Sequence, residues 1–433
     1  MTWYDLFSPT TEKWLTLTIF VACFALILYR NVKIAYVSLA AAALLIALGI
    51  VSPDSAFLQW DSWAVLTIYW GYGMLAIVFR ESKLPALVAS YVLARVKREK
   101  YALLFICALA AFLSSFMANP VIVIMLAPLA IEIAERLHAS LFLYLVGLAI
   151  SSNVVTTVSM VADPPATILA LETGMTFLDF YWFQGKVGLG TLSLVGVAVA
   201  LLTLLVQFRH LTNTVDIREE RIQVTYGPLM IFVLSVLVLA FLPLVFVSMR
   251  HAGFVLIVGL LVGLCSLYIA RNVAGAPRAM TQEFDWDTIW YLIGIFIVIG
   301  AVESVGLLKD FADWLQGTGL RSPTVYLLIL TWMSVALSAF IDNVPYTILM
   351  IPVCGYLAQS LGVSPWPFYF GMLVGTGIGG NITPVGATAN VLACGMLEQR
   401  GYRIDLGRYM KISVPFSVAA VAAVHILLQL IWL

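Results

Sequence analysis

Charged residues are scarce in this chain. Asp, Glu, Lys and Arg make up 11% of its 433 residues, whereas 62% are hydrophobic and the mean hydropathy is +1.01. So little charge excludes an ordinary soluble domain and predicts a polytopic protein of the lipid bilayer. Lys and Arg together number 23, as do Asp and Glu. The net charge is therefore zero, which by itself says nothing about partners, because the basic residues mainly set the topology. We expect a small inorganic ion or oxyacid as substrate and no nucleic-acid partner.

Cysteine and histidine are too few and too scattered to predict a metal site. The four histidines form no ligand set, and the cysteines stand singly in apolar segments, so we expect small buried side chains and no disulfides. The cysteines are Cys23, Cys107, Cys265, Cys354 and Cys394. Phosphate-binding glycine motifs and nucleophile motifs are also missing. We therefore expect no enzyme and no resident cofactor, and Na+ is the only bound ion that we expect.

Long apolar segments run through the whole sequence. A membrane-spanning helix needs about 20 mostly apolar residues. Segments of suitable length are 14–29, 34–51, 63–80, 140–171, 187–207, 227–248, 252–270, 287–305, 366–396 and 411–432. We expect the first to be a retained helix and not a signal peptide, because no small-residue cleavage site follows it. Two further stretches, 101–136 and 323–360, are long enough to enter the bilayer and turn back, which predicts two re-entrant hairpins.

A short sequence motif occurs twice, 224 positions apart. Residues 113–119 read LSSFMAN and residues 337–343 read LSAFIDN. Pro128 and Pro352 keep the same spacing, as do Gly147 and Gly371. Each copy lies at the centre of one predicted hairpin. Such duplication in an apolar chain indicates a transporter built from two related halves.

The polar segment 209–226 divides the chain into a first repeat, 1–208, and a second repeat, 227–433. Each half holds five predicted crossings. Because this number is odd, the second half has the opposite orientation in the membrane. The sequence therefore predicts an all-α polytopic fold with two inverted-topology repeats of five transmembrane helices, each with a re-entrant hairpin and an unwound helix. The charged stretches 82–100 and 308–321 precede the hairpins, and we expect both to lie in the membrane interface.

The distribution of Lys and Arg predicts the orientation, because cytoplasmic loops are enriched in them. An outward N-terminus places most of these residues on the cytoplasmic side, including Lys33 and the runs 95–100, 209–221 and 400–411. We therefore expect a protein of the cell (inner) membrane with both termini on the non-cytoplasmic side. The first hairpin would then enter from the cytoplasm and the second from outside.

Four breaks interrupt the apolar segments at membrane depth. Ala118-Asn119-Pro120 and Asp342-Asn343-Val344-Pro345 form the hairpin turns, and segments 140–171 and 366–396 contain Pro and Gly that prevent one continuous helix. Non-helical backbone is tolerated in the bilayer only where protein or a wet cavity satisfies it. These breaks therefore predict a shared polar site, with half-helix ends that present N–H groups or carbonyls to a ligand.

The sequence resembles the ion-transporter superfamily that includes NhaD-type sodium/proton antiporters, arsenite-efflux pumps, the melanosomal P protein and the divalent-anion/sodium symporters. The resemblance covers essentially the whole chain. It rests on Asp342-Asn343-Val344-Pro345 with Pro352, on Asp163-Pro164-Pro165, and on the glycine-rich run 379–390. It implies an inverted-repeat elevator transporter, often a homodimer, with ion and substrate held between hairpin tips and unwound helices.

Two departures from the dicarboxylate branch bear on the substrate. That branch places Ser-Asn-Thr at each tip, whereas these tips read Ala118-Asn119-Pro120 and Asp342-Asn343-Val344. The residues after Asp163-Pro164-Pro165 are Ala166 and Thr167, where an Asn is usual. Contacts assigned in that branch to the missing hydroxyls and amide are therefore in doubt here.

Asp342 is the strongest candidate for coupling, because a carboxylate at the bilayer midplane by default indicates an ion or proton site. The alternative is that it only caps the helix that follows. Asp163 is equally open to interpretation as a ligand or as a cap before two prolines. The predicted ion- or proton-coupling residues are Asp342, Asn343, Asn119 and Asp163, with Na+ at Asn119, Asn343 and Asp342. The predicted substrate-binding residues are Asn153, Thr156, Thr157, Asn381, Thr383, Thr388 and Asn390, although any of these amides could instead tie down loose backbone.

These residues predict a secondary active transporter of a small inorganic ion or oxyacid, driven by a proton or sodium gradient. Na+/H+ antiport is the favoured form, with arsenite-type efflux next, because a neutral hydroxylated substrate could use the same amides and hydroxyls. The alternative within transporters is sodium-coupled uptake of a carboxylate such as citrate, which the lack of Lys and Arg in the four breaks disfavours. The alternative from another class is a passive ion channel.

Overall fold

The computed structural model describes residues 8–29, 32–52, 54, 60–214, 222–246, 252–317 and 321–433. The secondary-structure elements of the described residues are all helical except for one small antiparallel hairpin, in which Trp182 pairs with Val187. The elements are α1 (Pro9–Tyr29), α2 (Ile34–Ala47), α4 (Trp60–Glu81), α5 (Leu84–Leu93), α6 (Glu99–Ser114), α7 (Asn119–Arg136), α8 (Leu141–Asn153), α9 (Pro164–Thr173), the single 3-10 turn η1 (Leu178–Phe180), β1 (Trp182–Phe183), β2 (Lys186–Val187), α10 (Leu189–Gln207), α11 (Gly227–Val245), α12 (Ala252–Ala270), α13 (Ala276–Gln282), α14 (Trp286–Ser304), α15 (Leu307–Gln316), α16 (Pro323–Ser338), α17 (Asn343–Leu361), α18 (Trp366–Gly379), α19 (Thr388–Glu398) and α20 (Leu406–Trp432).

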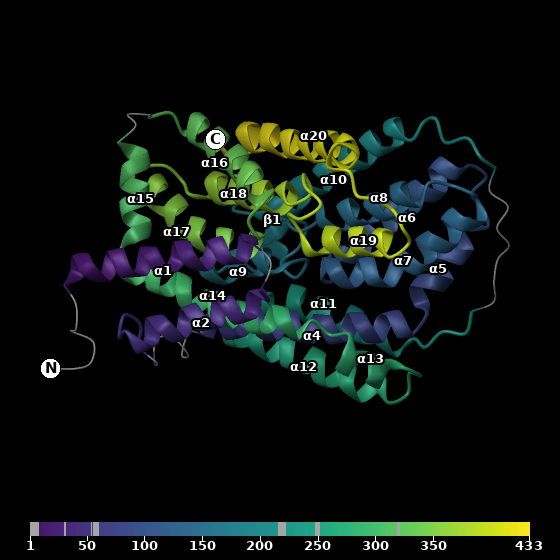
Figure 1. Cartoon of the computed structure of the whole chain (residues 1–433), viewed down its shortest axis with the longest axis horizontal. Coiled ribbons are helices and arrows are strands. Elements are labelled where there is room, and N and C mark those ends of the chain that lie inside the picture. The colour runs from purple at the N-terminus through teal and green to yellow at the C-terminus, as the bar shows by residue number, and fades with distance from the viewer. Residues whose placement is uncertain are drawn as a thin grey trace.

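Each repeat contains a helical hairpin and an interrupted helix, which confirms the predicted fold class. Helices α6 and α7 form hairpin 1, α16 and α17 form hairpin 2, and each pair is joined by a four-residue turn at 115–118 or 339–342. The two interrupted helices are α8 and α9, which flank residues 154–163, and α18 and α19, which flank residues 380–387. Figure 1 shows the hairpins at opposite ends of the molecule, as inverted repeats require.

In each repeat, one hydrogen bond joins the unwound segment to the hairpin, and the two bonds occupy equivalent positions. The hydroxyl of Ser159 donates to the carbonyl of Ser115, and the hydroxyl of Thr383 donates to the carbonyl of Ala339 over 2.5 Å. Both the donors and the acceptors are 224 positions apart. The turn of each hairpin leaves a carbonyl without a helical partner, and a hydroxyl from the neighbouring break satisfies it.

The halves interlock around these breaks. Helix α9 of the first repeat packs against α17 of hairpin 2, and α19 of the second repeat packs against α7 of hairpin 1. Outside this core, α4 pairs with α12 and α2 pairs with α14. A Cβ on Gly259 would lie 2.6 Å from the carbonyl oxygen of Thr67, and one on Gly294 would lie 2.5 Å from Ser38. Glycine therefore lets the backbones of both helix pairs approach closely.

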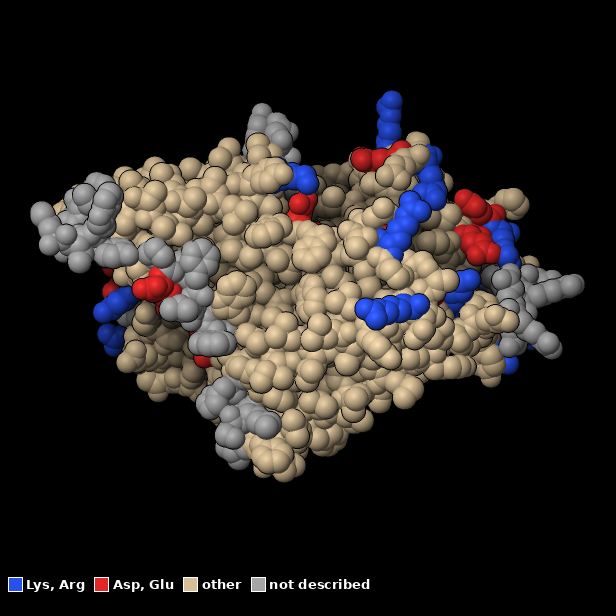
Figure 2. Space-filling model, turned by 90° about the horizontal axis from the view of Figure 1, so that it is seen from below, with Lys and Arg blue, Asp and Glu red and all other residues tan. Residues whose placement is uncertain are grey.

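Eight described helices are long and apolar enough to cross a membrane, namely those of residues 9–27, 62–81, 189–207, 227–245, 252–270, 286–304, 343–361 and 406–432. The start of α1 and the C-terminus lie on the left in Figure 1, whereas the Lys and Arg side chains visible in Figure 2 gather mainly at the right, where α5 and α13 lie. The cytoplasmic assignment of that end stays a prediction. Four of the arginines used to predict the orientation lie outside the described residues, namely Arg30, Arg218, Arg221 and Arg250.

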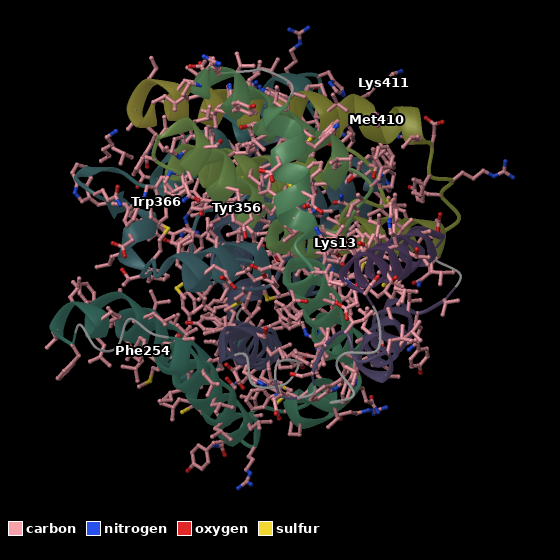
Figure 3. The ribbon with its side chains drawn as sticks, turned by 90° about the vertical axis from the view of Figure 1, so that its left-hand side faces the viewer. Lys13, Phe254, Tyr356, Trp366, Met410 and Lys411 are labelled. Atoms are coloured by element: carbon pink, nitrogen blue, oxygen red, sulfur yellow. The ribbon has the colours of Figure 1, made fainter. Side chains whose placement is uncertain are left out.

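The two stretches that precede the hairpins differ from each other. Helix α15 carries acidic residues along one face, and Lys13 of α1 binds Asp310 on it with a 2.7 Å ion pair. Figure 3 shows Lys13 beside this upright helix. Helix α5 instead carries no charged residue, and the basic residues predicted for an amphipathic arm follow it at 95–100.

The expectation that all cysteines are buried is wrong for Cys265, which is exposed on α12.

Candidate functional site

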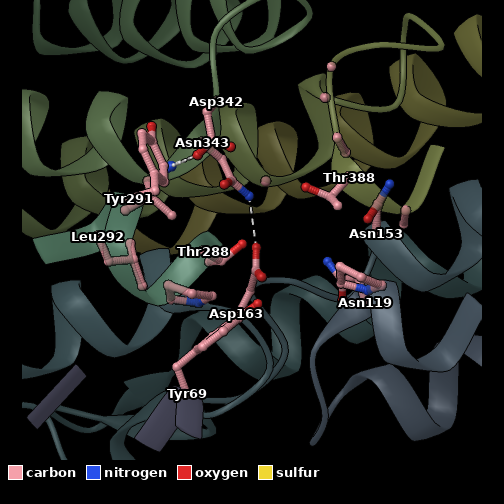
Figure 4. Close-up of a pocket in the computed structure, with 18 of the residues that line it drawn as sticks. Tyr69, Asn119, Asn153, Asp163, Thr288, Tyr291, Leu292, Asp342, Asn343 and Thr388 are labelled. Carbon is pink, nitrogen blue, oxygen red and sulfur yellow. Dashed lines mark hydrogen bonds between the residues drawn. The ribbon is translucent and has the colours of Figure 1, made fainter. Parts of the chain in front are cut away.

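A small cavity lies where the hairpin tips and the two unwound segments meet (Figure 4). Its volume is about 70 Å³. Helices α4 and α14 close it with Tyr69, Thr288, Tyr291 and Leu292. The predicted site residues that line it are Asn119, Asn153, Asp163, Asp342, Asn343 and Thr388. Four segments from two repeats therefore contribute to one polar site.

Asp163 binds across the repeats and does not cap its own helix. It precedes Pro164 and Pro165 at the start of α9, and its side chain makes no capping hydrogen bond. An N-cap side chain normally accepts from the second or third backbone N–H of the helix, and Pro165 has none. The carboxylate instead accepts a 2.8 Å hydrogen bond from the side-chain amide of Asn343, at the tip of hairpin 2.

Asp342 does cap its helix. Its Oδ1 accepts a 3.0 Å hydrogen bond from the backbone N–H of Val344 at the start of α17. The same side chain also lines the cavity near Asp163 and Asn343 (Figure 4). The capping interpretation is therefore correct in geometry, and it leaves the carboxylate facing the site. We refer to Asp163, Asp342 and Asn343 as the acidic half-site.

Each residue of the acidic half-site has an equivalent position in the opposite repeat, and these positions form a neutral half-site. We define it as Ala118, Asn119, Ala387 and Thr388. Ala118 is equivalent to Asp342, and Ala387 is equivalent to Asp163, at the same spacing of 224 residues. Asn119 is equivalent to Asn343, but no carboxylate faces it. In Figure 4 Asn119 and Thr388 lie to the right of the cavity, apart from Asp163 and Asp342. The two acids thus break the symmetry of the site.

The amide of Asn119 is oriented by its own hairpin. Its Oδ1 accepts a 2.5 Å hydrogen bond from the hydroxyl of Ser114, which leaves the NH₂ group for the cavity. Asn119 is only 4% exposed, and within the described residues its Nδ2 donates to no protein group. Ala118 and Ala387, the residues directly before α7 and α19, also provide no side-chain caps. The neutral half-site therefore holds hydrogen-bond donors that no protein acceptor uses.

Three of the predicted amides bind one another and hold the unwound backbone. Asn153 donates to Oδ1 of Asn381 over 2.9 Å and to Oδ1 of Asn390 over 3.0 Å. Asn381 in turn donates to the carbonyl of Ile150, and Asn390 donates to that of Gly380. We name Asn153, Asn381 and Asn390 the amide cluster. Asn381 and Asn390 do not line the cavity, which fits the alternative that they tie down loose backbone.

Of the four predicted threonines, one lines the cavity and three do not. Thr388 lines the cavity, whereas Thr383 bonds Ala339, as described above, and Thr157 shares a 2.7 Å hydrogen bond with Ser193 of α10. Thr156 is buried beside Gly377, and its hydroxyl has no protein partner within the described residues. These last three threonines do not contact the cavity.

Residues of α4 and α14 complete the site, and sequence patterns did not predict them. Thr288 donates from its hydroxyl to Asp285 Oδ2 over 2.5 Å, and the hydroxyl of Tyr69 lies 3.5 Å from the same oxygen. Asp285 also caps α14 by accepting from the Thr288 N–H. Tyr69 and Tyr291 stand among other aromatic residues in ordinary apolar helices, where interfacial anchoring is the usual role of aromatic side chains.

The spaces on the two sides of the cavity differ in size. An adjoining cavity of about 330 Å³ shares Thr288, Tyr291, Asp342 and Thr388 with it, and reaches the ion pair between Lys33 and Asp287. The hydrogen bond from Lys33 to that carboxylate raises the pKa of the lysine. On the opposite side, the equivalent residues Ala118, Pro164 and Thr167 line a cavity of only about 20 Å³.

Comparisons with known proteins agree with this architecture. The crystal structure of the Alcanivorax borkumensis YdaH transporter superposes with a TM-score of 0.56 at 15% identity, covering 97% of this chain and 98% of that one. An uncharacterized transporter of Mycobacterium tuberculosis is 27% identical over 429 residues, 97% of each chain. The P protein of Homo sapiens is 22% identical over 95% of this chain and 59% of its own length.

The family comparison covers most of the chain. Residues 24–375 match the CitMHS family, which is described as "Citrate transporter". The match includes both hairpins, the first interrupted helix and the first part of α18. Membership agrees with the resemblance to the wider ion-transporter superfamily and with a transporter that is not an enzyme. The chain belongs to the CitMHS citrate transporter family.

Proposed function

We propose that this chain couples the binding of a cation, H+ or Na+, in the acidic half-site to the transport of a small carboxylate or oxyacid bound in the neutral half-site. The observation that carries the proposal is the hydrogen bond between Asn343 and Asp163. Its counterpart across the repeats is missing, because the position equivalent to Asp163 is Ala387, which has no acceptor for the Asn119 amide. One half of the cavity therefore supplies negative charge, and the other supplies free donors.

The acidic half-site suits a cation. Asp163 and Asp342 approach one small cavity from different repeats, and no Lys or Arg of the described chain lines it. Two carboxylates in one small cavity are costly at membrane depth, so a bound proton or Na+ would lower that cost. A cation held there would also bring hairpin 2 and the first unwound segment together, because each contributes one of the two acids.

The neutral half-site suits an oxygen-rich acceptor. In the acidic half-site, the Asn343 amide donates to a carboxylate of the protein. In the neutral half-site, the equivalent Asn119 amide has no such partner, and a carboxylate of the substrate would take the place that Asp163 holds across the cavity. The uncapped start of α19 adds N–H groups, which favour anions at helix N-termini. The start of α7 adds fewer, because Pro120 has no N–H and the N–H of Val121 donates to the carbonyl of Ala118 over 3.1 Å.

A citrate-class carboxylate is our first candidate cargo, since it fits these donors and the family to which the chain belongs. Its negative charge would be repelled by Asp163 and Asp342 at short range. The cation must therefore bind with or before the anion, and this requirement couples the two. Simple Na+/H+ exchange is the second candidate, favoured by the pair of acids, and arsenite-type efflux would use the same amides with a neutral cargo.

The orientation, mechanism and assembly belong to the same proposal. In the predicted orientation the larger opening, beside Lys33, faces the cytoplasm, and the smaller cavity faces outward. The hairpins would enter the membrane from opposite sides and move with the unwound helices as an elevator. A homodimer in the cell (inner) membrane, with both termini outside, is the expected assembly.

The test is transport by purified full-length protein in liposomes. Citrate, Na+, Li+ and arsenite are offered in turn while a proton or sodium gradient is imposed. The proposal expects saturable citrate flux that follows the cation gradient, and loss of that flux in Asp342→Asn. Asp313→Asn, the same change at an exposed position of α15, is the matched control. Cation exchange without citrate flux would favour the second candidate, and linear flux that ignores an opposing gradient would indicate a channel.

A further inference from the structure

We propose that an apolar groove between α1, α15 and hairpin 2 binds an acyl chain of a membrane phospholipid. The groove has a volume of about 730 Å³ and lies apart from the transport cavity. Its walls are almost entirely hydrocarbon. They include Leu17, Val21 and Phe24 on α1, Phe311 on α15, and Leu337 and Met350 on hairpin 2. We call it the α1–hairpin groove, and it does not depend on which ion or substrate is transported.

Comparison of the repeats shows that this face of a hairpin is normally covered. On hairpin 1, Leu113 is 8% exposed, and Phe116 packs edge-on against Phe232 of α11 with ring centroids 5.3 Å apart. Helix α11 opens the second repeat as α1 opens the first. On hairpin 2, the equivalent Leu337 is 39% exposed. Protein covers the first hairpin here, whereas the second leaves space beside α1.

The mouth of the groove has the composition of a membrane interface. Lys13 and Asp310 pair there at 2.7 Å, and both remain partly exposed. Trp14 follows Lys13 in α1 and Trp314 lies one turn after Asp310 in α15, and their exposed fractions are 66% and 65%, as expected of rings at head-group level. The paired charges complement the phosphate and the amine of a zwitterionic head group. This places the mouth at the end of the molecule where Lys13 and α15 lie (Figure 3).

The dimensions suit one acyl chain. From Lys13 to Ala25 the helix rises about 18 Å at 1.5 Å per residue, close to the depth of one leaflet, about half of a 30 Å hydrocarbon core. The volume of the groove matches that of small-molecule pockets, about 300–1,000 Å³.

The experiment uses the full-length protein in nanodiscs of phosphatidylcholine and phosphatidylethanolamine that contain a few percent of phospholipid with a photoreactive diazirine in its acyl chain. After illumination, mass spectrometry locates the labelled peptides. We expect labelling of α1 and hairpin 2 to exceed that of the exposed face of α12 by at least about fivefold. Labelling spread evenly over all lipid-facing helices would contradict a specific groove.

Filling the groove supplies the matched comparison. Val21→Trp and, as a second and milder variant, Ala25→Phe should lower groove labelling several-fold while the melting temperature stays within a few degrees. Leu261→Trp, on the exposed face of α12, should leave groove labelling unchanged. Undiminished labelling in either folded groove variant would overturn the proposal. So would cross-links that join α1 of one copy to hairpin 2 of another.

Discussion

The side-chain amide of Asn343 donates a 2.8 Å hydrogen bond to the carboxylate of Asp163, 180 positions earlier in the chain. This bond joins the tip of hairpin 2 to the unwound segment of the other repeat. The equivalent pair, Asn119 and Ala387, cannot form it. The difference gives the cavity an acidic side and a side with free donors, and the predictions below follow from it.

Replacing either acid should remove coupling with little loss of fold. We expect Asp163→Asn and Asp342→Asn to reduce gradient-driven flux at least about tenfold, because the site loses the charge that attracts the cation. Asp163→Asn keeps an oxygen for the Asn343 amide, so the loss in stability should stay near 1 kcal/mol. Flux in liposomes and thermal melting in detergent measure the two effects. Asp313→Asn should change neither.

The two tip asparagines should have different roles despite their equivalent positions. Asn119→Ala removes a free donor of the neutral half-site, so the KM for the cargo should rise about five- to tenfold while the cation dependence is kept. Asn343→Ala leaves Asp163 without its partner and should change the cation dependence first. Measuring flux against cargo and against cation for both variants tests this. Identical profiles for the two variants would contradict separate half-sites.

A new carboxylate in the neutral half-site should mimic the cargo. In Ala387→Asp the added side chain can accept from the Asn119 amide, as Asp163 accepts from Asn343. We expect cargo binding to fall at least about tenfold through occupation of the donor and charge repulsion. Ala387→Asn adds a side chain of similar size without charge, so cargo binding should fall less in this variant. Equal loss in both variants would mean that steric bulk, and not the carboxylate, excludes the cargo.

The amide cluster should matter for stability more than for substrate contact. Asn153→Ala leaves Oδ1 of both Asn381 and Asn390 buried without its donor, at a cost of about 1–3 kcal/mol for each unsatisfied group. The melting temperature should therefore fall clearly. Thr388→Val, which alters a side chain exposed to the cavity, should shift it little. A larger fall for Thr388→Val than for Asn153→Ala would contradict this division.

Much of this fold could be predicted from sequence because proline, glycine and the duplicated element mark the breaks. Pro120 and Pro345 start the second helix of each hairpin, and the glycine-rich run after α18 cannot remain helical. Helix ends were less predictable. Helix α2 stops at Ala47 where the apolar segment continues to 51, since hydropathy alone does not mark a turn.

The site could be predicted only in part. Asp163, Asn119 and Thr388 face the cavity as expected, but Asn381 and Asn390 turn away from it. In an unwound segment no periodicity fixes which side chain faces inward, because each orientation depends on local backbone angles and on the nearest unsatisfied carbonyl. Tyr69 and Tyr291 enter the site only because of how α4 and α14 pack, which sequence pattern does not reveal.

The most direct test of the account is gradient-driven uptake of labelled citrate by liposomes that contain either the wild-type protein or Asp342→Asn. The account predicts saturable uptake by the wild type that follows an imposed proton or sodium gradient, and none above background for Asp342→Asn at equal amounts of folded protein. Full gradient-driven uptake by Asp342→Asn would contradict the assignment of the cation to the acidic half-site.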